Sequence, residues 1–428
     1  EIGLKPACAS ACLAGALDFG VIETTPENRE DLDIEIPGFP STEITQPNIR
    51  FQQKNHLPDE MKRPDSRPVS YTKNDKGQYR PGVDGNNSSR EWNLKALSTR
   101  ENPLVIFTLV SQMVIGAFIL LFVGPTFGIE LLSAASHHLA WPLTLFGLIG
   151  IQTLALVLST MHLGKPHRFY RAFNNLRYSP VSREVAGIAV FYNFLGAYTL
   201  LTALPMLFEW LPENVHQIFI AMSGWGAVVA GLAAIYFMHR IYRIPARPFW
   251  NHWQVLTSFY GNMLTLGPLL ILLVTALVQL TSGGVWNEFV PELAMLMLLG
   301  LMLEAYGLYV HADDLRNNGG EGLASHYEQT TKFGKTYLAR NVGLLLSMSM
   351  IFLLATTNAD GGFALLLWAT VAIVVTITAI AGRALFYALV IPTTMPGAFF
   401  WRNKGFEEHA RETGLAEMPQ VGVLPNTH

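Results

Sequence analysis

The sequence predicts an all-α integral membrane protein with eight transmembrane helices, a short N-terminal segment and an extended polar arm. Half of the 428 residues are hydrophobic and only 14% are charged, whereas a soluble protein has roughly 25% charged residues. The apolar residues form long runs, and a helix needs about 20 of them to cross a bilayer. These runs cover 103–126, 139–163, 184–208, 215–239, 254–281, 289–311, 336–357 and 361–390.

The predicted spans lie within 103–390, and three further segments flank them. Residues 24–102 are rich in proline, asparagine and charge, a composition that cannot bury enough apolar surface to fold alone. We therefore expect this segment to run as an extended arm over soluble partner proteins. Segment 1–23 precedes the arm, and a tail, 391–428, follows the last span. The net charge of −3 gives no indication of a nucleic-acid partner.

The distribution of lysine and arginine predicts the orientation in the membrane, because cytoplasmic loops carry an excess of these residues. All 29 of them lie before the first span, near or beyond the end of the last, or around the links that follow the second, fourth and sixth spans. The four remaining links contain none. We therefore expect both termini and the charged links to face the cytoplasm.

Both cysteines, Cys8 and Cys12, lie in the first segment, four residues apart. A structural disulfide is uncommon in the cytoplasm, and a zinc or iron-sulfur site normally takes four protein ligands. The residues alone therefore leave a metal role for this pair open.

The stretch "KPACASACLAGALDFG" resembles the last cysteine group of the four-cluster ferredoxin-like iron-sulfur subunits in the dimethyl sulfoxide reductase family, although Leu13 replaces the usual proline. "QPNIRF", from Gln46 to Phe51, also resembles the extended tail of those subunits. The resemblance implies that Cys8 and Cys12 ligate [4Fe-4S] clusters, whose other ligands lie in a missing upstream segment or a partner. We interpret 1–23 as the end of a ferredoxin-like iron-sulfur domain.

Three stretches of the membrane part resemble the membrane anchor subunit of the same family. They are "PLVIFTLVSQMVIGAFIL", "MHLGKPHRFYRAFNNLRYSPVSREVAGIAVF" and "GRALFYALVIPTTMPGAF". The resemblance implies eight spans, a quinone site near the face that meets the iron-sulfur subunit, and no haem. The molybdopterin would be held by a separate catalytic subunit.

His162 in "MHLG" and Glu184 in "SREVAG" match positions implicated in quinol binding in that family. Their chemistry suits this role, since quinol oxidation needs a hydrogen-bond partner for the quinone oxygen and a proton acceptor. Arg183 is a further candidate for quinone binding. Glu304 is a candidate for proton transfer, because ionisable groups inside a membrane are functional candidates by default.

Each candidate also has a structural explanation. His162 would cap its helix or anchor it at the interface, and Glu184 would interact with the dipole near a helix start. Arg183 would form a salt bridge with a partner protein, and Glu304 would make a buried hydrogen bond. Arg383 would be the buried partner of a carboxylate.

Two functions of other classes remain open. His162, His239 and His311 end three predicted spans on the same side, which would suit a haem b held by two imidazoles. A transporter would explain eight spans but not the cysteine segment. It would also predict inverted repeats, and the two halves show no convincing repeat.

We therefore expect a quinone-interacting anchor and electron-transfer subunit of a molybdopterin oxidoreductase complex of anaerobic respiration. It would pass electrons between menaquinone or ubiquinone and [4Fe-4S] clusters, while the substrate site lies in the catalytic subunit. A reductase of S-oxides or N-oxides and a cytoplasmic sulfite-oxidising enzyme that reduces quinone both remain open. The expected partners are the catalytic subunit, the remainder of the iron-sulfur subunit, lipid and quinone, with no nucleic acid. The expected location is the prokaryotic cytoplasmic (inner) membrane.

Overall fold

The computed structural model describes residues 32–33, 51–52, 59–63, 67–75, 79–85, 89–98, 101–133, 139–161, 163, 165–282, 286–357 and 359–393. The chain divides into two compact units. The helical unit comprises Ser66–Ser70 and Pro81–Pro392, and the other unit comprises Glu1–Asp65, Tyr71–Arg80 and Thr393–His428.

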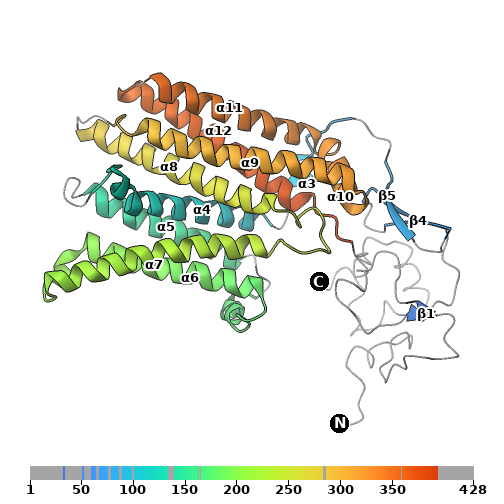
Figure 1. Cartoon of the computed structure of the whole chain (residues 1–428), viewed down its shortest axis with the longest axis horizontal. Helices are drawn as coiled ribbons and strands as arrows, with labels where there is room; N and C mark the ends of the chain where they lie inside the picture. Colours follow the sequence, from blue (N-terminus) through green and yellow to red (C-terminus); the bar gives the residue numbers. More distant parts are fainter. Residues whose placement is uncertain are drawn as a thin grey trace, which may run out of the picture. The chain divides into compact units, whose positions relative to one another are not determined.

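The described part of the chain is mostly helical (Figure 1). Strands β1 and β2 pair antiparallel, and β3, β4 and β5 form a three-stranded sheet in that order. The elements are β1 (Leu32–Asp33), β2 (Phe51–Gln52), β3 (Glu60–Lys62), β4 (Val69–Lys73), β5 (Tyr79–Val83), α3 (Leu94–Leu97), α4 (Asn102–Val123), η1 (Gly124–Phe127), α5 (Ala140–Met161), η2 (Pro166–Phe173), α6 (Pro180–Ala203), η3 (Pro205–Phe208), α7 (Glu213–Arg240), α8 (Gln254–Ser282), α9 (Val290–Asn318), α10 (Gly320–Thr330), α11 (Gly334–Thr357) and α12 (Gly361–Ala388).

Eight of the helices in the described residues are long and apolar enough to cross a membrane, which confirms the predicted number of spans. They are α4, α5, α6, α7, α8, α9, α11 and α12. One boundary that matters for the site is the start of α6, which the sequence placed at residue 184. The helix begins at Pro180, with Ser179 as its N-cap accepting a hydrogen bond from the backbone N–H of Ser182. Glu184 therefore lies one turn inside the helix.

The predicted end of the sixth span at His311 is wrong, because α9 continues to Asn318. Leu315 is buried and keeps this polar extension attached to the protein. The helix ends at Gly319, whose φ of 72° lies in the region that glycine adopts without strain. His311 is thus a buried residue within a continuous helix.

Helix α4 lies at the centre of the bundle. It packs against α5, α7, α8 and α12, and its span has the largest buried share of the eight. Figure 1 shows the pair α6 and α7 on one side of it and α8, α9, α11 and α12 on the other. The helices with the smaller buried shares present apolar side chains outward, as expected for contact with lipid.

Glycine allows α8 and α9 to approach closely. A Cβ atom on Gly261 would lie 2.6 Å from the carbonyl oxygen of Gly300, and one on Gly300 would lie 2.5 Å from that of Gly261. The hydroxyl of Thr265 donates to the carbonyl of Gly261 at 2.9 Å and to that of Met297 at 3.3 Å. Small residues and hydroxyl bonds of this kind bring membrane helices together. This contact places Glu304 of α9 opposite the polar residues of α8.

Part of the predicted polar arm is attached to the helical unit. The backbone N–H of Glu91 donates to the carbonyl of Thr331, and its carbonyl accepts from Lys335, both at 3.0 Å. The hydroxyl of Thr336 donates to the carbonyl of Trp92 at 3.0 Å. The segment just before α4 is therefore bonded to the turn between α10 and α11. The predicted boundaries of the arm and of the two terminal segments stay predictions.

Candidate functional site

Three of the predicted site residues lie in the described part of the chain: Arg183, Glu184 and Glu304. His162, Cys8 and Cys12 lie outside the described residues. Their predicted roles therefore stay predictions.

Arg183 holds the link between α5 and α6. Its Nε atom donates to the carbonyl of Leu176 at 2.9 Å, and Nη2 donates to the carbonyl of Arg177. The side chain is half-buried. These bonds agree with a structural role for Arg183.

Glu184, in contrast, is a buried residue of α6 whose charge acts on two tyrosines. The carboxylate interacts electrostatically with Tyr242, in the link between α7 and α8, and with Tyr387 of α12. Burial raises the pKa of Tyr242 well above its ordinary value, and the neighbouring Tyr387 and Glu184 raise it further. Tyr242 is therefore a neutral hydroxyl group near a buried carboxyl group.

Aromatic rings surround Tyr242. Its ring makes edge contacts with Trp250 at 5.1 Å, Phe259 at 5.8 Å and Phe386 at 4.9 Å between centroids. The indole N–H of Trp250 donates to the carbonyl of Phe386 at 2.8 Å, which fixes the link on α12. The polar groups are thus held in rigid apolar walls.

Sequence reasoning missed the two tyrosines. Tyr387 follows Arg383 by four residues, so both lie on one face of α12. This spacing within "GRALFY" was the signal that could have found Tyr387. Nothing local in the sequence indicates that Tyr242, in another part of the chain, meets it.

Arg383 is buried where α4, α8 and α12 meet. Its guanidinium carbon lies 3.9 Å from the centroid of the Phe259 ring, and Nη2 donates to Oε1 of Gln112 at 3.2 Å. Glu304 interacts with it electrostatically. No carboxylate of the described residues forms a salt bridge with Arg383, so its direct partners are an aromatic ring and an amide.

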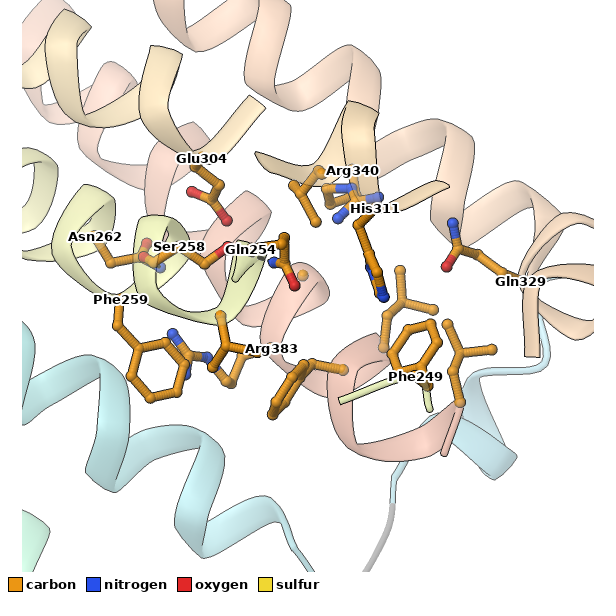
Figure 2. Close-up of a pocket in the computed structure, with 16 residues that line it drawn as sticks. Phe249, Gln254, Ser258, Phe259, Asn262, Glu304, His311, Gln329, Arg340 and Arg383 are labelled. Atoms are coloured by element: carbon orange, nitrogen blue, oxygen red, sulfur yellow. Dashed lines mark hydrogen bonds between the residues drawn. The ribbon is translucent and has the colours of Figure 1, made fainter. Parts of the chain in front are cut away.

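A cavity with polar walls lies between α8, α9, α11 and α12 (Figure 2). Glu304 and His311 of α9, Arg340 of α11 and Arg383 of α12 line it and are all buried. The enclosed volume is about 30 Å³, which is room for about two water molecules. The remaining polar residues of the wall are Gln254, Ser258, Asn262 and Gln329.

His311, which lines the cavity, stacks on a second histidine, His252, in the link between α7 and α8. The rings of His252 and His311 stack with centroids 4.9 Å apart, and Nε2 of His252 lies 2.9 Å from Oδ2 of Asp314. The Nδ1 atom of His252 accepts from the backbone N–H of Gln254 at 3.0 Å. Burial lowers the pKa of His252, Asp314 raises it, and Arg243 lowers it. A neutral His252 therefore donates its Nε2–H to Asp314.

The histidines considered as haem ligands contact different neighbours. His239 bonds the carbonyl of Tyr236 through Nδ1, whereas His311 packs against Phe249 and His252. His162 is outside the described residues.

Comparison with known proteins shows one family. The model of the DMSO reductase anchor subunit (DmsC) family matches residues 97–389. The protein is 25% identical over 203 residues to the anaerobic dimethyl sulfoxide reductase chain YnfH of Escherichia coli (strain K12), covering 47% of its own length and 67% of the relative. It is 28% identical over 200 residues to the C subunit of anaerobic dimethyl sulfoxide reductase from the same strain, covering 46% of its own length and 65% of the relative. It is 28% identical over 162 residues to the C subunit of anaerobic dimethyl sulfoxide reductase from Haemophilus influenzae (strain ATCC 51907 / DSM 11121 / KW20 / Rd), covering 37% of its own length and 53% of the relative. The matches thus span about half to two thirds of the length of these relatives.

Proposed function

Because the protein belongs to the family of DMSO reductase anchor subunits, we propose that it exchanges electrons and protons with quinone in the membrane on behalf of a molybdopterin oxidoreductase. The catalytic and iron-sulfur subunits of the complex would carry out the substrate chemistry and the electron transfer beyond the quinone. The contribution of this protein is to bind quinol, orient it and accept its protons.

The observation that carries this proposal is the burial of Glu184 beside Tyr242 and Tyr387. Oxidation of a quinol releases protons from its two hydroxyl groups, so the protein must provide an acceptor close to a quinone oxygen. The carboxylate form of a buried glutamate is such an acceptor, and a neutral phenol donates a hydrogen bond to the quinone carbonyl that forms. We assign these tasks to Glu184 and to the tyrosine pair. His162 would bind the other quinone oxygen.

The electrons would leave through iron-sulfur clusters, which accept them one at a time. We propose that Cys8 and Cys12 provide thiolate ligands to such clusters and that 1–23 ends a ferredoxin-like domain. The thiolate is the ligand type that these clusters require. The remaining ligands would come from outside this sequence, and the molybdopterin would be bound by the catalytic subunit.

The names of the relatives favour reduction of an S-oxide as the reaction of the complex. Electrons would then flow from quinol through the clusters to the catalytic subunit. The sulfite-oxidising alternative would use the same site in the opposite direction. The absence of lysine and arginine from four of the links supports an orientation with both termini in the cytoplasm.

A comparison of two carboxylate variants tests this function in the assembled complex. We expect Glu184→Gln to lower quinol oxidation at least tenfold and to leave substrate reduction by a soluble dye unchanged, because the dye delivers electrons without passing the quinone site. His162→Ala should give the same separation. Glu213→Gln is the matched control, since Glu213 is an exposed carboxylate at the start of α7. Normal quinol oxidation in Glu184→Gln would contradict the assignment.

A further inference from the structure

The cavity between α8, α9, α11 and α12 contains buried polar groups that the proposed quinone site does not use. The carboxylate of Glu304 forms no hydrogen bond or salt bridge with any residue that the structure describes. Nε2 of His311 and Nη1 of Arg383 are also buried without a hydrogen-bond partner among the described residues. An unpartnered polar group costs more inside a membrane than elsewhere, because no bulk water reaches it.

These three groups line the same enclosed space (Figure 2). Together they offer a donor in Arg383, a ring nitrogen of His311 that donates or accepts according to its tautomer, and a carboxyl group that acts as either according to its protonation. A ligand that satisfies all three must both donate and accept hydrogen bonds. The volume of about 30 Å³ is far below the roughly 300 Å³ of a small-molecule pocket. Water meets both requirements, whereas a quinone ring does not fit.

His311 places a ring nitrogen at the cavity. Its Nε2 atom is buried and has no hydrogen-bond partner among the described residues. A neutral imidazole carries its one hydrogen on either Nδ1 or Nε2. With the hydrogen on Nδ1, the ring presents the lone pair of Nε2 to the cavity, and this is the form that receives a proton there.

Glu304 and His311 lie on one face of α9. They are seven residues apart, or two turns, and this spacing corresponds to a rise of about 10 Å along the helix. Glu304 lies deeper in the span, and His311 lies beside the link between α7 and α8. A few water molecules between them would connect the interior of the bundle to that link.

The charges around Glu304 suit a group that releases and binds a proton. Arg340 of α11 and Arg383 of α12 both interact electrostatically with Glu304. His252 lies behind His311 and is bonded to Asp314. The two guanidinium groups offset the negative charge that Glu304 acquires when it loses its proton. The neutral His252 adds no positive charge next to His311.

We propose that this cavity is a hydrated proton-transfer site, in which Glu304 and Nε2 of His311 exchange a proton through bound water. The proton leaves the Glu304 carboxyl group and passes through water to His311, which becomes an imidazolium and then releases it toward the link between α7 and α8. The direction reverses when protons enter. The inference rests on the proposed function, since the protons exchanged are those of the quinol.

Infrared difference spectroscopy of the purified complex in lipid nanodiscs tests the site. Spectra taken between mildly acidic and mildly alkaline buffer should show a carboxylic acid C=O band that shifts in D2O. The band should be absent in Glu304→Gln and present in Glu292→Gln, which changes an exposed carboxylate of the same helix. In His311→Asn the band should remain, but the pH at which its intensity changes should differ from that of the wild type. A band that is identical in Glu304→Gln and the wild type, or that does not shift in D2O, would overturn the proposal.

The outcome separates this inference from the proposed function. The spectrum of Glu184→Gln should keep the Glu304 band even when quinol oxidation is lost. If the band is lost in Glu304→Gln but Glu184→Gln oxidises quinol at the normal rate, the proton site is retained and the assignment of Glu184 to the quinone site is refuted. If Glu304→Gln does not assemble, the wild-type D2O shift and the pH change in His311→Asn decide the question, and their absence rejects the site.

Discussion

The hydroxyl oxygens of Tyr242 and Tyr387 lie 2.6 Å apart and join the link between α7 and α8 to the end of α12. Glu184 and Arg383 both interact electrostatically with this pair. Only one of the two hydroxyls donates in the bond between them, so the hydrogen of the other is free for a further acceptor. The pair therefore connects the buried carboxyl group of α6 to the buried guanidinium group of α12.

Removing one of these hydroxyls should destabilise the bundle. Tyr387→Phe leaves the hydroxyl of Tyr242 buried without its partner, which costs about 1–3 kcal/mol of unfolding free energy. Thermal or denaturant unfolding in detergent measures the loss. Tyr192→Phe is the control, because the hydroxyl of Tyr192 bonds Thr153 at an exposed position, and we expect a change within about 0.5 kcal/mol. Equal stability of the two variants would contradict the role of the pair.

The close contact between α8 and α9 predicts that adding one methyl group at Gly300 destabilises the protein. In Gly300→Ala the new Cβ would lie 2.5 Å from the carbonyl oxygen of Gly261, so the helices must separate. We expect a loss of about 1–3 kcal/mol, as for other overpacked sites, and a lower yield of folded protein. Gly147→Ala provides the matched control, since nothing lies within 4 Å of a Cβ there. An unchanged melting temperature for Gly300→Ala would show that the helices are not packed this closely.

The stability of the protein should fall in mild acid because of His252. Burial lowers the pKa of this ring in the folded state, and the charge of Arg243 adds to this effect, while Asp314 opposes it. The unfolded protein, with a histidine pKa of about 6.5, therefore binds a proton that the folded protein does not. The resulting stability is present above pH of about 6.5 and is lost as the pH falls toward the folded pKa.

Two variants test this pH dependence through the melting temperature measured between about pH 5 and pH 8. His252→Gln should flatten the fall, because the titrating group is gone. Asp314→Asn should steepen it, because the carboxylate that favours the protonated ring is removed. The same slope in His252→Gln as in the wild type would assign the pH dependence to other groups, such as His326, whose pKa is lowered by burial and by Arg316.

The iron-sulfur assignment of the first segment predicts a spectroscopic change. In the assembled complex, Cys12→Ser should alter or remove a [4Fe-4S] signal in the electron-paramagnetic-resonance spectrum, since serine is a poor substitute for the thiolate. Iron analysis and the optical spectrum of the same sample provide the comparison. Unchanged cluster content would reject Cys12 as a ligand, and a reduced haem b band would return His162, His239 and His311 to consideration as axial ligands.

Local sequence was sufficient to identify the membrane spans and the family. Each span is a continuous run of apolar residues, and a helix in lipid satisfies its own backbone hydrogen bonds, so the run alone determines the element. The sequence also indicated that Glu304 is unusual, because a carboxylate within such a run is costly, whereas Glu184 was identified through the family resemblance. It misplaced the ends of α6 and α9, where Ser179 and Gly319 decide the boundary rather than hydropathy.

Only the tertiary structure decided which of these groups meet. Tyr242 and Tyr387 are 145 residues apart in the sequence, and Gln112 and Arg383 are 271 apart. No period or motif encodes such contacts, because they depend on how α4, α8 and α12 pack around one another. The close approach of α8 and α9 at Gly261 and Gly300 likewise brings the polar face of α8 to Glu304. The sequence by itself thus determined the helices, the membrane and the family, whereas helix packing decided which buried charges share a cavity.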